Sequence, residues 1–573
     1  MKEKTATLAL LGILLGGLAV RSWGIGQGYP DFYGHVDEIG VAASIWNFFR
    51  AGTLLPTEFT YPAFYSYLVA GLLWLSAWLG AAPEMERQLD ALVLVSYVDP
   101  ARLALIGRGL SAVLSSLAIF VTYRLGRQAF GPGVGLLAAL LLAFSRAPIV
   151  QAHQGLPDST MAFLALLCFY FSWKIYQRGN WLDYAAAGIA AGLVVATKYN
   201  GAFSALAIVA GHILRAIAIR ASLQKTVLAG KLWLAIGLAF IALFGGSPYL
   251  FLAHEKYLAV ATYQVSSLDF TLGQTTPWWW IVEGLVGSGY DLGGMALVAG
   301  IGWALYRRSP LDWIFLAAWV PSFAYIGSWT RESMHYLLHF YPLLALGGAR
   351  VVLSLAGHFR PGWLTFVLAA GCILPNVYLG VGHGRQLMRP DTRALAADWI
   401  EENLPEGTRL GMTWLPYCPR LDLQPMRQSL RNYYRGNLAA QEYLDAVWRG
   451  KPAYHLVNLE VWRQQPVVPE YYRDKVDLED PETRRIFRRN WLSAGQLRDR
   501  EVEYIVLPEA VYGRYLRDEL PPQGTAAHFH YLKNHTYFKH LIASQSAVAE
   551  RVASILSGPD TRGGTIHIFR LLP

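Results

Sequence analysis

The stretch FYGHVDEIG, residues 32–40, places two adjacent carboxylates, Asp37 and Glu38, shortly after the first apolar segment of a very apolar chain. A charged group beside an apolar membrane segment is costly to desolvate, and such groups usually have a task. The helix-forming sequence EIGVAASIWNFF follows directly. We therefore expect Asp37 at the cap or in the first turn of a helix, where the helix dipole favours an anion.

The composition indicates a polytopic membrane protein. Of 573 residues, 54% are hydrophobic and 16% charged, whereas soluble proteins carry about 25% charged residues. The three cysteines have no metal-type spacing and suggest no disulfide framework. The sequence shows no glycine-rich phosphate loop, so neither nucleotide nor nucleic-acid binding is indicated.

Apolar segments long enough to cross a bilayer recur along the chain. The first is expected to be an uncleaved span rather than a signal peptide, because no small-residue cleavage site follows it. The eleven expected spans are residues 6–25, 103–123, 133–150, 159–176, 181–196, 202–219, 232–249, 290–306, 313–328, 337–355 and 363–379.

Charge sets the expected topology, because cytoplasmic loops of membrane proteins collect Lys and Arg. The eleven spans place every basic loop inside, together with the N-terminus. Those loops hold Lys2, Lys4, Arg124, Arg127, Lys174, Arg178, Arg215, Arg220, Lys225, Lys231, Arg307, Arg308, Arg350 and Arg360. A further apolar run, residues 61–79, would invert everything after it if it crossed fully. We expect it to lie in the membrane interface.

The chain changes character near Arg385 and has no spanning segment after it. Residues 389–407 predict a helix capped by Asp391. The stretches RLGMTW, AYHLVNL, EYIVLP and TIHIFRLL predict strands. The expected fold is therefore a mainly α-helical bundle of about eleven spans, residues 1–384, with an interfacial helix in the first outer loop. An extracytoplasmic α/β domain, residues 385–573, follows it.

With this topology, the polar residues of chemical interest gather at the outer end of the bundle. Asp37 and Glu38 lie in the first outer loop, and AHQGLPDST brings His153 and Asp158 to the same face. The turn ATKYNG adds Lys198. A carboxylate there can act as a general base toward a hydroxyl, and a cation can hold a departing phosphate. For any one residue, simple contact with water remains the alternative explanation.

Several segments resemble, in order, the GT-C glycosyltransferases of the protein O-mannosyltransferase and aminoarabinose-transferase type. The resemblance covers roughly residues 1–410. Its segments are HVDEIGVAASIWNFFRAG, YPAFYSYLVAGLLWL, the region from PARLALIGRGL to GLPDSTMAFLAL, GLVVATKYNG and DTRALAADWIEENLPEGTRL.

This resemblance implies that a sugar is transferred from a polyprenyl-phosphate-linked donor to a hydroxyl acceptor on a protein, lipid or cell-envelope glycan. Asp37 matches the catalytic base, Glu38 a positioning neighbour and Asp158 the second acidic position. The implied location is the plasma (inner) membrane, with an inside N-terminus and an extracytoplasmic active site and C-terminal domain. Other partners are the membrane lipids.

Three cations match positions where relatives could hold the donor phosphate. Lys198 matches the lysine of the turn, Arg331 lies at an outer loop, and Arg102 stands at the Arg-Leu helix start, where its role could be structural only. His35 and His153 are not required by the family. With Asp37 and Asp158 they could form a divalent-metal site, so a divalent cation remains an alternative to metal-free transfer.

A transporter or lipid flippase without transferase chemistry is the competing function. Transporters hold their ionisable residues near the bilayer midplane on broken helices. In this chain the acids cluster at one face and a folded domain follows, which favours the enzyme. A scaffold protein whose bundle is only an anchor is disfavoured, because eleven spans exceed what an anchor needs.

Overall fold

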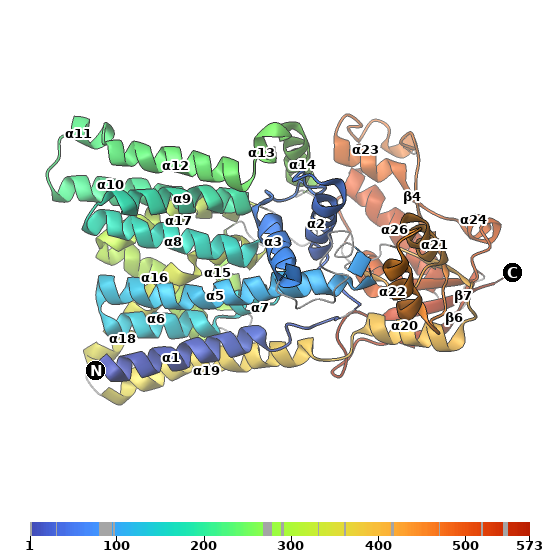
Figure 1. Ribbon diagram of the computed structural model, residues 1–573, viewed down its shortest axis with the longest axis horizontal. Coiled ribbons are helices and arrows are strands. Elements are labelled where there is room, and N and C mark those ends of the chain that lie inside the picture. Colours follow the sequence, from blue (N-terminus) through green and yellow to red (C-terminus); the bar gives the residue numbers. More distant parts are fainter. Residues whose placement is uncertain are drawn as a thin grey trace.

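The computed structural model describes all residues except 1–2, 30, 79–93, 96–97, 268–277, 288–290, 330–331, 360–361, 414–416, 469, 517–519, 543–547 and 573. The chain forms a long helical bundle with an α/β domain at one end (Figure 1). The N-terminus lies at the opposite end of the bundle from that domain. The predicted fold class is confirmed.

Each of the eleven predicted spans coincides with a helix of the bundle. These helices are α1 (Glu3–Ser22), α5 (Pro100–Phe130), α6 (Pro132–Phe144), α8 (Asp158–Gln177), α9 (Trp181–Thr197), α10 (Leu206–Ala218), α12 (Gly230–Gly246), α16 (Leu292–Arg307), α17 (Pro310–Gly327), α18 (Tyr341–Phe359) and α19 (Gly362–Leu387).

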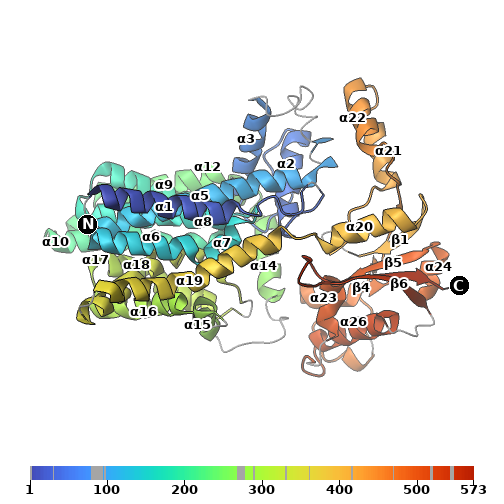
Figure 2. The ribbon, with the colours of Figure 1, turned by 90° about the horizontal axis from the view of Figure 1, so that it is seen from below.

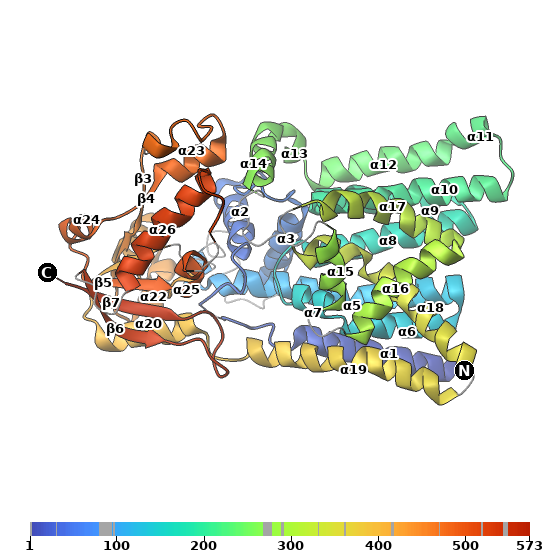
Figure 3. The same ribbon diagram turned by 180° about the vertical axis from the view of Figure 1, so that it is seen from behind.

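By length and composition, seven helices of the described residues can each cross a membrane, and α6 with α7 (Arg146–Ala152), bent by 56°, makes an eighth. The shorter α9, α16 and α17 run alongside them (Figures 1 and 3). Short helices and 3₁₀ turns connect these elements or extend their ends. They are η2 (Tyr199–Ala205), α11 (Leu223–Val227), α13 (Tyr249–Leu252), α14 (His254–Ser267), α15 (Trp279–Val286) and η4 (Met334–Phe340).

The apolar run at residues 61–79 does not extend the bundle. It contributes α3 (Phe64–Trp78), which with α2 (Glu38–Ala51) lies across the domain-facing end, transverse to the bundle helices (Figures 1 and 2). Trp74 and Trp78 of α3 are exposed, as expected for a helix in the membrane interface. The placement agrees with the expectation that this segment is not a crossing.

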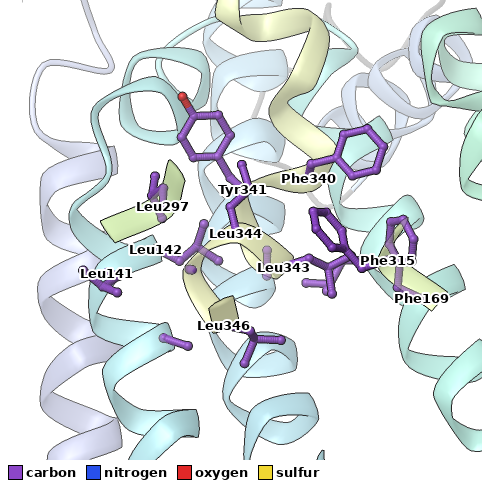
Figure 4. Packing of buried hydrophobic residues seen from close by; sticks show 14 of the residues in the cluster. Leu141, Leu142, Phe169, Leu297, Phe315, Phe340, Tyr341, Leu343, Leu344 and Leu346 are labelled. Atoms are coloured by element: carbon purple, nitrogen blue, oxygen red, sulfur yellow. The ribbon is translucent and has the colours of Figure 1, made fainter. Parts of the chain in front are cut away.

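Apolar side chains and small residues hold the bundle together. Phe169, Phe315, Phe340 and several leucines of α6 and α18 interlock in its interior (Figure 4). Helices α9 and α12 approach closely at Gly188, where an added Cβ would stand 2.2 Å from the carbonyl oxygen of Ala235. Only glycine admits that approach, so this pair of helices is fixed by backbone contact.

The domain after α19 is built on a five-stranded sheet of order β2-β1-β5-β7-β6. The strands are β1 (Arg409–Met412), β2 (His455–Asn458), β5 (Tyr504–Pro508), β6 (Ala549–Ile555) and β7 (Ile566–Leu571). β1 pairs in parallel with β2 and β5, whereas β7 pairs antiparallel with β5 and β6. The four predicted strands are all present, and β6 is an additional edge strand.

The sheet buries both faces because side chains alternate along its central strand. On β5, Ile505 and Leu507 pack with Phe538 of α26 (Ala526–Ile542), while Val506 packs with Ile400 of α20 (Thr392–Asn403). The predicted cap of α20 is present, since the Asp391 side chain accepts a hydrogen bond from the Arg393 N–H at 2.9 Å.

The remaining elements surround the sheet. β3 (Glu460–Trp462) and β4 (Arg489–Trp491) form a separate antiparallel pair. The other helical elements are α21 (Gln424–Tyr433), α22 (Leu438–Trp448), η6 (Glu470–Tyr472), α23 (Pro481–Arg488), α24 (Ala494–Asp499), α25 (Glu509–Tyr512) and η7 (Gly513–Tyr515). Helix α19 ends at Leu387, three residues beyond the expected boundary; the division into domains itself stays a prediction.

The α/β domain docks on the first outer loop through an arginine pair that shares one acid. Asp391 accepts hydrogen bonds from Arg562 at 2.6 Å and from Arg393 at 2.8 Å. Arg562 also donates to the Gln27 side chain at 2.7 Å, and Arg393 donates to the Tyr33 carbonyl at 3.2 Å. Burial raises the pKa of Asp391, but the two arginines outweigh it and leave the pKa below its usual value.

The sidedness of the bundle gives a first prediction. The α10–α12 connection lies at the end away from the α/β domain (Figure 1), and the basic-loop rule puts that end in the cytoplasm. The three native cysteines are buried, so a new exposed cysteine can be read alone. Asp560→Cys in the domain should react with an impermeant thiol reagent in intact cells, and Gln224→Cys only after permeabilisation. The opposite labelling pattern would contradict the assigned orientation.

Candidate active site

The carboxylate of Glu38 is the central hydrogen-bond acceptor, or hub, at the domain-facing end of the bundle. Arg108 of α5 donates to it twice, from Nε to Oε1 at 2.9 Å and from Nη2 to Oε2 at 2.8 Å. The backbone N–H groups of Gly155, Gly34 and His35 donate to it at 2.7, 2.8 and 3.3 Å. Burial raises the pKa of Glu38, but Arg108 and these donors outweigh it, so the pKa lies below its usual value.

This saturation decides what Glu38 can do. Its side chain is 1% exposed and accepts five hydrogen bonds, which leaves no free position for a substrate. Arg108 uses its remaining nitrogen to donate to the carbonyl oxygens of Ile25 and Gln27 at 3.1 and 2.6 Å. The geometry gives Glu38 the role of positioning the first outer loop.

The contact with Gly155 also sets the position of the second acid. An added Cβ at Gly155 would stand 3.1 Å from the Ala104 carbonyl and 3.2 Å from Glu38 Oε1. The absence of a side chain lets the loop before α8 lie directly on α5. Asp158, three residues later, therefore begins α8 beside the first outer loop.

Asp37 is placed differently from its neighbour. It precedes α2 as the N-cap residue, but its side chain makes no capping hydrogen bond. Its side chain is 38% exposed, and Oδ2 accepts a hydrogen bond from the Tyr61 hydroxyl at 3.1 Å. The predicted position at the helix start is present, but the side chain does not cap the helix.

Lys198 and Asp158 form a buried ion pair behind Tyr61. Lys198 Nζ donates to Asp158 Oδ1 at 2.8 Å, and the two side chains are 6% and 2% exposed. The ammonium lies 4.8 Å from the centre of the Tyr61 ring and 5.7 Å from that of Tyr336. Tyr61 thus contacts the Lys198–Asp158 pair with its ring and Asp37 with its hydroxyl.

The same tyrosine stays protonated. Burial raises the pKa of Tyr61 well above its usual value, and the carboxylates of Asp37 and Asp158 raise it further. Its hydroxyl is therefore a donor to Asp37 at all physiological pH values. Asp37, Tyr61, Lys198 and Asp158 form a continuous polar row, which we call the acid–lysine row.

A cavity of about 370 Å³ opens beside Asp37. Asp37 and the first two turns of α2 line one side of it, through Ile39, Gly40, Val41, Ala43 and Ser44. Tyr61, Tyr65 and Pro157 belong to the opposite wall. The cavity brings a half-exposed carboxylate next to a space large enough for a sugar-sized group.

The two predicted histidines, His35 and His153, contact different groups. His35 Nδ1 accepts the Asp37 N–H at 3.1 Å. His153 has its Nδ1 2.8 Å from the Ile149 carbonyl oxygen and its Nε2 3.0 Å from that of Trp23. Among the described residues, no group of three or more His, Cys, Asp or Glu could hold a metal ion. The alternative metal site of His35, Asp37, His153 and Asp158 is therefore not assembled.

Of the other two cations, Arg102 lies in the first turn of α5, where its N–H is capped by Asp99 at 3.2 Å. This backbone contact places Arg102 next to Asp99. Arg331 lies outside the described residues. Lys198 is thus the predicted phosphate ligand that the structure brings to the row.

Two residues at this site escaped the sequence analysis. Arg108 stands in the same quoted segment as Arg102, six residues further along, and only its burial distinguishes it. Tyr61 opens the segment YPAFYSYLVAGLLWL, and a Tyr-Pro start before an apolar helix carries no signal of a carboxylate partner. A buried arginine inside a span was the one detectable clue, because such residues are usually paired.

Comparison with known proteins agrees with this geometry. Residues 105–250 match the family model described as dolichyl-phosphate-mannose-protein mannosyltransferase. The matched region begins within α5, just before Arg108, and contains Asp158 and Lys198. It confirms the predicted relationship to the GT-C membrane glycosyltransferases and, with it, the class of enzyme. No curated protein matches the chain.

Solved structures with a similar arrangement include two GT-C proteins. The oligosaccharyltransferase AglB from Archaeoglobus fulgidus, bound to an inhibitory peptide and a dolichol-phosphate, is 13% identical, with 90% of this chain and 70% of that one covered and a TM-score of 0.48. ArnT from Cupriavidus metallidurans, bound to undecaprenyl phosphate, is 14% identical, with 79% and 90% covered and a TM-score of 0.45.

The Glu38–Arg108 pair gives a prediction about stability. Arg108→Ala would leave a buried carboxylate without its cation, which typically costs about 3–5 kcal/mol. Purified protein should unfold at a clearly lower temperature in detergent. Arg431→Ala is the matched control, because Arg431 and Asp445 pair at 2.9 Å on the surface, both about half exposed; such pairs contribute about 0–1 kcal/mol. Equal effects of the two substitutions would contradict the hub role.

Proposed function

We propose that this protein transfers a sugar from a polyprenyl-phosphate-linked donor to a hydroxyl acceptor on the extracytoplasmic face of the membrane, with Asp37 as the general base and inversion at the anomeric carbon. The observation that carries the proposal is the exposure and hydrogen bonding of the Asp37 carboxylate. It is partly exposed on a cavity, it performs no helix capping, and it accepts a hydrogen bond from the Tyr61 hydroxyl.

The reaction follows from these positions. The acceptor hydroxyl enters the cavity beside Asp37 and gives its proton to that carboxylate as its oxygen attacks the anomeric carbon. A new carbon–oxygen bond forms on one face of the sugar, and the bond to the phosphate oxygen breaks on the other. The polyprenyl phosphate leaves with the bonding electrons.

Lys198 is the proposed partner of that departing phosphate. Its ammonium is oriented by Asp158 and flanked by two aromatic rings, so its position is fixed before the donor arrives. A preorganised cation stabilises charge that develops in the transition state without reorganising. Asp158 acts through Lys198 in this scheme and does not touch the sugar.

A transporter function is less consistent with the structure. The acid–lysine row lies at the domain-facing end of the bundle, where α2 and α3 cross it (Figure 2). Transport sites lie near the bilayer midplane. The α/β domain covers this end through Arg562, Arg393 and Asp391, and a cavity of about 210 Å³ remains between His35, Tyr417 and Arg562. Val36 lines both this cavity and the one beside Asp37.

Asp37→Asn tests the base directly. Asparagine preserves the size and can still accept a hydrogen bond from Tyr61, but it cannot take a proton. General base catalysis contributes about 10²- to 10⁴-fold, so transfer by purified protein should fall by that factor while its thermal unfolding is unchanged. Glu38→Gln is the contrasting variant, which should lower stability more than the rate constant of the folded fraction. Near-normal transfer by the Asp37→Asn protein would rule out the assignment.

Lys198 requires a paired test, because removing it leaves Asp158 buried and uncompensated. Lys198→Ala should reduce donor binding or turnover by about 10- to 150-fold, the value of a charged hydrogen bond of about 1.5–3 kcal/mol. The double variant Lys198→Ala, Asp158→Asn restores neutrality and should recover stability without recovering transfer. Recovery of transfer in the double variant would show that Lys198 only balances Asp158.

A further inference from the structure

The cavity of about 210 Å³ between the bundle and the α/β domain lies outside the acid–lysine row. Its walls come from residues 33–36 of the first outer loop, from the start of α20, and from residues 562–564 of the loop between β6 and β7. The described residues that line it include none from a bundle helix. We call this space the junction cavity.

The β6–β7 loop is held against the start of α20 by its backbone. The Arg562 N–H donates to the Pro390 carbonyl at 2.8 Å, and the Arg562 carbonyl accepts the Thr392 N–H at 2.8 Å. Gly563 has a φ of +101°, which favours glycine, and an added Cβ would stand 2.5 Å from Thr392 Oγ1. In Figures 1 and 3 this loop extends from the sheet toward the end of α19. The fold therefore fixes Arg562 in the cavity wall.

The guanidinium of Arg562 has one donor that the protein does not use. Its side chain is 11% exposed, with Nη1 donating to Gln27 at 2.7 Å and Nη2 to Asp391 at 2.6 Å. Its Nε is buried and has no hydrogen-bond partner among the described residues. A buried charged donor without an acceptor is costly, and such groups are rare unless water or a ligand completes them. The unpaired Nε therefore indicates an acceptor atom from outside the protein.

Further donors belong to the same cavity wall. His35 Nδ1 accepts the Asp37 N–H at 3.1 Å, so the neutral ring carries its proton on Nε2. Within the part of the chain that the structure describes, this Nε2 has no partner. The N–H groups of Gly563 and Gly564, which also line the cavity, make no hydrogen bond to a described residue. The junction cavity thus has several donors for one anionic or strongly polar group.

The charges around the junction cavity also favour an anion. Among its described lining residues Asp391 is the one carboxylate, and it already accepts hydrogen bonds from two arginines. Tyr417 lines the cavity as well. Burial raises the pKa of Tyr417, while Arg514 lowers this pKa and Asp37 raises it. Both charges therefore lie near the Tyr417 hydroxyl, so the domain brings a further cation to the side of the bundle where Asp37 lies.

We propose that the junction cavity binds an anionic group, a phosphate or a carboxylate, of the acceptor whose hydroxyl reacts at Asp37. Arg562 Nε is its charged donor, and hydrogen bonds from a cation to an oxyanion are among the stronger ones. Val36 lines both this cavity and the one beside Asp37, so the anion lies next to the reacting hydroxyl. The identification of the ligand as the acceptor rests on the proposed function.

The acceptor fits the junction cavity better than the donor does. The cavity is formed by the first outer loop and the α/β domain, so no described bundle helix guides a prenyl chain into it. Lys198, the proposed partner of the donor phosphate, does not line it. Inversion also requires the attacking hydroxyl and the departing phosphate to lie on opposite faces of the sugar. Glucose 6-phosphate and glucuronate combine hydroxyls with one of the two anions and are therefore suitable probes.

Protection of a thiol tests this binding without relying on transfer activity. Ala510 lines the junction cavity and is exposed, and the three native cysteines are buried. In purified full-length Ala510→Cys protein, glucose 6-phosphate or glucuronate should slow the reaction with N-ethylmaleimide, whereas glucose at the same concentration should not. Gln224→Cys, exposed at the opposite end of the bundle, should react at the same rate with and without these sugars. The more effective anionic probe identifies the anion as phosphate or carboxylate.

A conservative substitution identifies the contact. Arg562→Lys keeps a cation beside Asp391 but removes Nε, so the probe concentration for half protection should rise by about 10-fold or more. Arg551→Lys is the matched control, because Arg551 is exposed on β6 and does not line the cavity. This control should leave half protection unchanged. Protection by glucose equal to that by the anionic sugars, or an unchanged value in the Arg562→Lys protein, would overturn the anion contact.

Two further measurements separate this inference from the proposed function. Asp37→Asn should abolish most transfer yet keep the protection at position 510, because the base is not a donor to the anion. Near-normal transfer by that variant, with protection intact, would refute the proposed base and leave the anion site in place. Undecaprenyl phosphate should protect position 510 much less than the anionic sugars do. Equal protection by undecaprenyl phosphate would overturn the assignment of this cavity to the acceptor.

Discussion

The buried pairing of Glu38 with Arg108 is the constraint on which the rest of the domain-facing end of the bundle depends. A carboxylate and a guanidinium removed from water are favourable only when every remaining lone pair and N–H finds a partner. Here those partners are backbone groups of the segment after α1, the first outer loop and the loop before α8. These hydrogen bonds therefore hold three segments of the chain against one point of α5.

At this point of the structure the neighbouring acids Asp37 and Glu38 have different surroundings. The Glu38 side chain is buried, and its oxygens are fully occupied by hydrogen bonds within the protein. Asp37, on the other side of the peptide, faces the cavity. The ring of Tyr61 then separates the exposed carboxylate from the buried Lys198–Asp158 pair. The partly exposed Asp37 carboxylate and the buried Lys198 ammonium therefore lie on opposite sides of the Tyr61 side chain.

The sequence predicted the fold better than the site. Long apolar segments depend on local composition, so a helix of the bundle could be expected at each of the eleven predicted spans. The charge argument also kept the run that contains α3 out of the bundle. Strands β1, β5 and β7 are paired on both sides, and the edge strand β2 lies in the apolar stretch AYHLVNL. The other edge strand, β6, is mostly exposed and lacks the alternation that reveals a strand.

The site depended on facts that composition does not contain. Arg102 and Arg108 lie six residues apart, which on a helix is about 240° of rotation, so one faces the loop near Asp99 and the other the interior. Sequence pattern gave the Asp37, Asp158 and Lys198 positions through the family resemblance. It could not show that Tyr61 joins them, because that contact is made by a loop whose path is set by the Glu38–Arg108 pair.

The docking of the α/β domain has a consequence for how the chain matures. Gln27 receives its hydrogen bond from Arg562, a residue 535 positions later. During synthesis the helices can insert one after another, yet this hydrogen bond cannot form until the α/β domain has been made. Closure of this contact is therefore a late event that depends on synthesis of the α/β domain.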